Sequence, residues 1–149
     1  MQDSILKETK IEYLMGYEKA LRQMIRMREN IGELYLDRHP SSARLTGMPS
    51  GHNKKDLSDY EALLESEKMK YIQSRYERIK ICKEIIACIE TLDDEDEKDI
   101  LTLHYIRRKN WQYIAFKMGI SVQHVHKIHN KALENLKIFE NAIECDGQM

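Results

Sequence analysis

Residues 111–130 read WQYIAFKMGISVQHVHKIHN, and this stretch decides the fold of its part of the chain. Two short segments with apolar residues at helical spacing flank Gly119, which can adopt the positive φ of a tight turn without steric cost. Ala115 is small enough for two helices to cross closely, and Ser121 suits the N-cap of the second helix. The pattern predicts a helix-turn-helix, a shape that places one helix in a DNA groove. We expect its core to comprise Trp111, Ile114, Ala115, Gly119, Val125 and Ile128.

An ordinary helical hairpin with a glycine turn is the alternative, because Gly caps and aliphatic spacings of three or four residues are common in buried helices. The combination of small residue, glycine, N-cap and two apolar faces favours the helix-turn-helix. Charge supports the same interpretation. Between residues 104 and 137 seven Lys and Arg residues stand against the single acid Glu134, a balance of +6 in a chain whose net charge is −1. This local excess favours contact with phosphates.

Three short motifs follow an acidic run at residues 93–99: L-x-x-x-Y, I-A-x-x-x-G-x-S and V-x-x-x-x-x-x-A-L. They are carried by Leu101 with Tyr105, by residues 114–121, and by Val125 with Ala132 and Leu133. In this combination, residues 92–137 resemble region 4 of bacterial sigma factors. The resemblance implies contacts to promoter-type, double-stranded DNA and to RNA polymerase. The segment SARLTGMPSG also resembles small phage and prophage sigma-like regulators of the ArpU/RinA type.

The chain departs from the sigma pattern in two respects. Tyr113 stands where the family often has Glu, and the second helix of the motif has Gln123, His124 and Lys127 where many members have more Arg. No aromatic, basic segment suited to promoter melting precedes residue 90, which argues against a complete sigma factor.

The exposed side of the second motif helix is the expected reader of base edges. Gln123, His124 and Lys127 point away from its apolar side, and Gln suits adenine whereas Lys suits guanine. Residues around them are expected to hold phosphates. These phosphate contacts are Arg107, Arg108, Lys109, Ser121, Asn130 and Lys131.

The expected fold is all-α, with a long, coiled-coil-like N-terminal helical hairpin followed by a three-helix helix-turn-helix domain. We place two long helices at residues 4–35 and 58–91, the second starting with a Ser58 and Glu61 capping box. Residues 37–56, which contain both prolines, form the connecting loop, residues 92–138 the motif domain and residues 139–149 a tail. The apolar side of the second helix should hold Leu64, Tyr71, Ile72, Ile79, Cys82, Ile86 and Ile89. The apolar sides of the two long helices could pair within one chain or between two chains, so a homodimer through the N-terminal helices stays open.

Other classes of site find little support. Residues two apart on a helix, such as His124 and His126, point about 200° apart, so we expect no metal site. Cys82 and Cys88 fit a helical pattern and should be packing thiols. No phosphate-cradling Gly loop or nucleophile elbow is found, so we expect no cofactor and no enzyme. With no apolar run long enough for a bilayer and no signal peptide, we expect a cytoplasmic protein without membrane contact.

The sequence therefore predicts a sequence-specific DNA-binding transcriptional regulator of phage or prophage type, acting at promoters with RNA polymerase. Two alternatives stay open. One is a coiled-coil DNA-packaging or assembly protein similar to small terminase subunits, and the other is a polymerase-binding inhibitor that makes no DNA contact.

Overall fold

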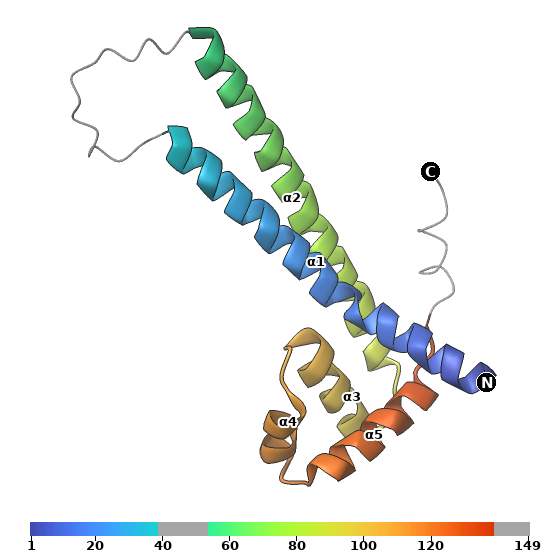
Figure 1. Ribbon diagram of the computed structural model, residues 1–149. Coiled ribbons are helices and arrows are strands. Elements are labelled where there is room, and N and C mark those ends of the chain that lie inside the picture. The colour runs from blue at the N-terminus through green and yellow to red at the C-terminus, as the bar shows by residue number, and fades with distance from the viewer. Residues whose placement is uncertain (39–53, 139–149) are drawn as a thin grey trace. The chain divides into compact units, whose positions relative to one another are not determined.

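The computed structural model describes residues 1–38 and 54–138, and all regular secondary structure in these ranges is helical, as predicted. The elements are α1 (Gln2–Arg38), α2 (Lys54–Glu90), α3 (Glu95–Leu101), a π-helical turn (Thr102–Ile106), α4 (Trp111–Met118) and α5 (Val122–Asn135) (Figure 1). None of these helices has the length and apolar content that a membrane span requires. The predicted loop at 37–56 and tail at 139–149 lie mostly outside the described residues.

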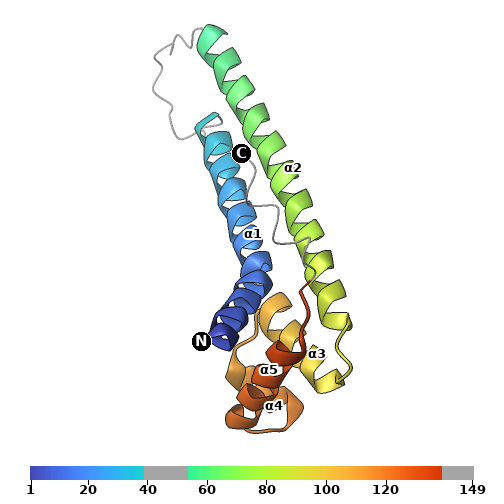
Figure 2. The same cartoon turned by 90° about the vertical axis from the view of Figure 1, so that its right-hand side faces the viewer.

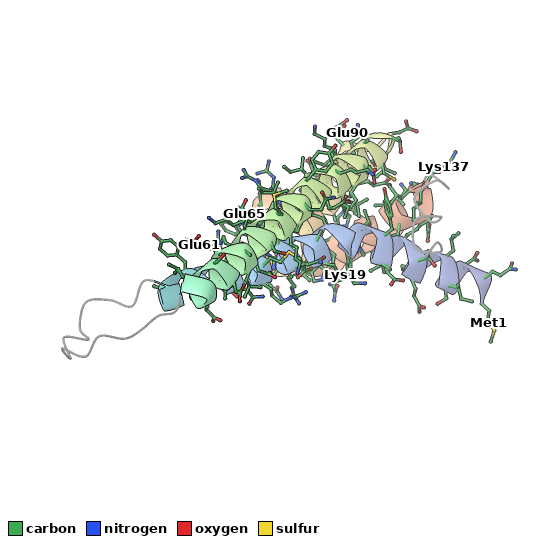
Figure 3. All side chains as sticks on the ribbon, turned by 90° about the horizontal axis from the view of Figure 1, so that it is seen from above. Met1, Lys19, Glu61, Glu65, Glu90 and Lys137 are labelled. Carbon is green, nitrogen blue, oxygen red and sulfur yellow. The ribbon has the colours of Figure 1, made fainter. Side chains whose placement is uncertain are left out.

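The chain divides into two compact units, and each long helix contributes to both. The hairpin unit is Ala20–Arg78. The core unit combines Met1–Lys19 with the chain from Ile79 onward. The start of α1, which Figure 3 shows from Met1 to Lys19, therefore packs with the helix-turn-helix, an arrangement that the sequence did not predict.

In the hairpin unit, α1 and α2 lie side by side and run in opposite directions (Figure 2). Leu64 of α2 is buried, and the Tyr60 hydroxyl donates a hydrogen bond to the Leu34 carbonyl of α1. The predicted start of α2 at Ser58 is wrong, because the helix begins at Lys54 and Ser58 lies inside it. Ser58 and Glu61 therefore cannot form an N-terminal capping box.

The buried side of α2 agrees with the predicted one only in part, since Leu64 and Ile89 are buried as predicted. Ile72, Ile79 and Ile86 are exposed, whereas Ile85 and Cys88 are buried. Ile72, Ile79 and Ile86 are seven residues apart, and so are Leu64 and Tyr71, and Ile81 and Cys88, so the periodicity alone could not show which row faces the partner helix. The row that packs inward contains Leu64, Tyr71, Ile81, Ile85 and Cys88, each buried or half-buried.

The core unit has two apolar clusters instead of the single three-helix core expected. The first cluster joins the start of α1 and the end of α2 to α3, the π-helical turn and α5. It contains Leu14, Ile85, Cys88, Ile89, Leu92, Leu101, Tyr105, Ala132, Leu133 and Leu136. The second lies within the helix-turn-helix and contains Ile100, Leu103, Ile114, Ala115 and Val125. Helix α3 and the π-helical turn contribute side chains to both clusters. They therefore connect α4 and α5 to the start of α1.

The acidic run forms the start of α3. The Asp94 side chain accepts hydrogen bonds from the Asp96 and Glu97 amides, as an N-cap does. Unlike its neighbours, Glu97 is buried, and its two carboxylate oxygens lie 3.1 and 3.2 Å from the Asn135 side-chain amide nitrogen. Glu97 thus links the start of α3 to the end of α5.

Candidate nucleic-acid interface

Both ends of α4 are capped. Asn110 has an extended backbone, and its side-chain oxygen accepts a hydrogen bond from the Tyr113 amide at 2.8 Å. At the other end Gly119 has φ 68°, in the left-handed region, and the Ile120 amide donates to the Ala115 carbonyl at 3.1 Å. These contacts end α4 where the sequence motif predicts and aim the chain into the next helix.

Helix α5 presents the predicted base-contacting residues to solvent. Its N-cap is Ser121, whose hydroxyl oxygen accepts a hydrogen bond from the His124 amide at 3.1 Å. Val125 is fully buried, while Gln123, His124 and Lys127 are exposed. The three side chains therefore lie on the free side of the first turns of α5, which is the geometry that groove reading requires.

The remaining core residues of the motif occupy different depths. Ile114 and Ala115 are buried, Trp111 and Ile128 are half-buried, and Gly119 is exposed at the surface of the turn. Gly119 thus contributes through its backbone conformation and not through packing.

A basic turn precedes α4. The Arg107 amide donates to the Thr102 carbonyl at 3.0 Å, and the Lys109 amide donates to the Leu103 carbonyl at 2.9 Å. Between them Arg108 has φ 57°, which is unusual for a residue with a side chain. All three side chains are exposed. The turn thus holds three cations on a fixed backbone beside the helix-turn-helix.

Two of the predicted phosphate contacts have partners on α1. Arg108 lies 3.5 Å from a carboxylate oxygen of Glu18, and the side-chain oxygen of Asn130 accepts a hydrogen bond from the Lys7 ammonium at 2.6 Å. The other predicted phosphate contacts, Arg107, Lys109, Ser121 and Lys131, are exposed. The first turns of α1 therefore bring a further cation, Lys7, next to the exposed side of α5.

Lys10 connects α1 to the end of α5. It is 8% exposed, and its ammonium donates to the Leu133 carbonyl at 2.7 Å and lies 3.4 Å from the Glu134 carbonyl. Carbonyls in the last turn of a helix lack partners within the helix and carry the negative end of its dipole. A buried ammonium at this position satisfies them, so Lys10 fixes α1 to the reading helix.

Replacing Lys10 with methionine is expected to lower the free energy of unfolding by about 1 to 3 kcal/mol, because the apolar stem is kept but charged hydrogen bonds to carbonyls are lost. Urea unfolding followed by circular dichroism measures the change. Lys19→Met is the matched control. Lys19 lies on the same helix, but its side chain is exposed and its ion pair with Glu12, at 3.8 Å, is a surface pair that contributes little stability. Equal stabilities of the two variants would contradict this role for Lys10.

Aromatic and histidine side chains of the π-helical turn, α4 and α5 form a cluster. The His104 ring stacks on Trp111 with a centroid distance of 3.7 Å, and its Nδ1 donates to the Lys109 carbonyl at 3.0 Å. His129 of α5 is buried, and its Nε2 lies 2.9 Å from the Tyr105 hydroxyl. The cluster therefore connects the π-helical turn, the basic turn and α5.

Burial shifts the titration of this cluster. It lowers the pKa of His129 to about 4, with smaller contributions from His104, Lys7 and His126, and it raises the pKa of Tyr105 to about 12. Burial also lowers the pKa of His104, against the opposing hydrogen bond to Lys109. His129 is consequently neutral at pH 7 and packs as an uncharged aromatic residue.

The capped α4, the turn at Gly119 and the capped α5 form the predicted helix-turn-helix. Residues 88–137 match the family model for Sigma-70, region 4. The match confirms the resemblance drawn from the motifs, and it covers about a third of the chain. Comparisons with curated proteins and with solved structures found no match. The segment is a helix-turn-helix similar to sigma region 4, and this similarity indicates DNA binding in transcription regulation.

Several residues of this region were not predicted. Lys7, Lys10 and Glu18 come from α1, far from the motif in sequence, and their spacing on one side of a helix was the only available signal. The π-helical turn and the left-handed backbone conformation of Arg108 have no pattern that a single sequence would show. Among the described residues, no group of three or more His, Cys, Asp or Glu side chains could hold a metal ion.

Proposed function

We propose that this protein is a sequence-specific, DNA-binding transcriptional regulator of phage or prophage type, which acts at promoters together with RNA polymerase. The observation that carries the proposal is the exposed face of α5, where Gln123, His124 and Lys127 are presented by a capped helix inside a sigma region 4 match. The basic turn and Lys131 add exposed cations that suit phosphates.

Selection of bound fragments from a random DNA pool, followed by fluorescence anisotropy in moderate salt, tests the proposal. We expect the selected site to bind more tightly than random DNA of the same length. Equal affinity for both would overturn the claim of sequence-specific regulation. Retention of the bound fragment by RNA polymerase only when the protein is present would support the promoter role.

Two substitutions should distinguish recognition of the bases from binding of the phosphates. Gln123→Ala is expected to weaken binding to the selected site by about 5- to 100-fold and to relax the preference at one position. Arg107→Ala should weaken binding to selected and random DNA alike and reduce the slope against salt by about 1. Lys19→Ala, which removes an exposed cation of α1, is the control and should change neither quantity. Identical behaviour of the Gln123 and Arg107 variants would contradict the assigned roles.

A further inference from the structure

Helix α2 carries a second apolar row that nothing in the described chain covers. Its members are Met69, Ile72, Tyr76, Ile79 and Ile86, with exposed fractions of 59%, 59%, 66%, 39% and 38%. They follow one another at steps of three and four residues, with Lys83 at the remaining position, and this is the spacing of a coiled-coil seam. We call these six residues, together with Glu65 one step and Ala62 two steps before them, the outer row.

The outer row is separate from the row that packs on α1. Leu64 and Met69 are five positions apart on an uninterrupted helix, so their side chains point about 140° away from each other. Single exposed apolar residues are ordinary on a protein surface, but a seam of five at coiled-coil spacing is not. The row therefore has the form of a surface that another helix covers.

The order of residues in the outer row is symmetric about position 74. Two antiparallel copies of α2 aligned there place Ile72 opposite Tyr76, Met69 opposite Ile79 and Ala62 opposite Ile86. The same alignment places Glu65 opposite Lys83 on both sides of the two-fold axis, and both side chains are exposed. Every apolar member thus meets an apolar member, and the two charged members meet each other.

A parallel pair lacks this complementarity. It would bring Glu65 against Glu65 and Lys83 against Lys83, and like charges in a seam oppose association. The antiparallel pair has one unfavourable contact, between the two Arg75 side chains beside the axis, where exposure to water weakens the repulsion. We propose that the outer row of α2 binds a second copy of this chain in an antiparallel, two-fold arrangement centred on residue 74. The proposal does not depend on DNA binding.

Sedimentation equilibrium of the full chain across the micromolar range tests the surface. We expect a dimer, and we expect Ile72→Glu to raise the dissociation constant by about 100-fold, because each dimer then buries two carboxylates in its central layers. Leu63→Glu is the matched control, since Leu63 lies on α2 outside the outer row and is 47% exposed. Circular dichroism checks that both variants keep their helices.

Charge exchange tests the orientation. Glu65→Lys and Lys83→Glu should each weaken the dimer about tenfold by placing like charges opposite each other, and the double variant should recover most of the loss. In a parallel dimer the exchange would bring no recovery, which would overturn the arrangement. A wild-type chain that stays monomeric, or a dimer that Ile72→Glu leaves intact, would overturn the surface itself and assign the outer row to a different helical partner or to none.

Discussion

Replacing Leu14 with alanine is expected to lower the free energy of unfolding of the core unit by about 3 to 5 kcal/mol. Leu14 is 0% exposed and packs in the first apolar cluster with residues of α2, α3 and α5. Truncation leaves a cavity where the start of α1 meets the reading helix. Such a loss is a large fraction of the stability of a small domain, so DNA binding should fall with it although Leu14 lies far from the motif in sequence.

The matched control for Leu14→Ala is Leu6→Ala, because Leu6 lies on the same segment of α1 and is 55% exposed. Urea unfolding followed by circular dichroism gives both free energies, and anisotropy on a selected DNA site gives the functional consequence. A cost below about 1 kcal/mol for Leu14→Ala would mean that the helix-turn-helix folds without α1. The packing described for the core unit would then be wrong.

Local signals predicted the helix-turn-helix well. Gly119 and Ser121 act as the turn and the N-cap that the sequence predicts, and Asn110 caps α4 in the same way, because capping depends on atoms within a few positions of the chain. The same holds for the all-α fold class. By contrast, the roles of Gln123, His124 and Lys127 in reading DNA stay predictions, since exposure shows only that they are accessible.

Long-range packing could not be predicted in the same way. In the sequence Lys10 cannot be distinguished from an exposed lysine. Its partner, the Leu133 carbonyl in the last turn of α5, is brought next to it only by the tertiary fold. On α2 two apolar rows have the same seven-residue period, so the sequence could not distinguish Ile72, which is exposed, from Ile85, which is buried. The second row is informative for that reason, since it indicates a contact beyond the single chain.

His129 gives the core unit a dependence on pH that can be measured. Its pKa is lowered from 6.5 to about 4 by burial, so between these values the unfolded chain binds a proton that the folded protein excludes. The stability contributed by neutral His129 is complete above pH 6.5 and is lost as the pH falls to about 4, a difference of about 3 kcal/mol.

We expect His129→Gln, which keeps a polar partner for Tyr105 but cannot titrate, to lack this part of the pH dependence. Urea unfolding between pH 4 and 7 measures it, with His124→Gln as the control because His124 is exposed. Equal slopes for wild type and His129→Gln would show that folding does not lower the pKa of His129, and the packing of a neutral His129 against Tyr105 would have to be abandoned.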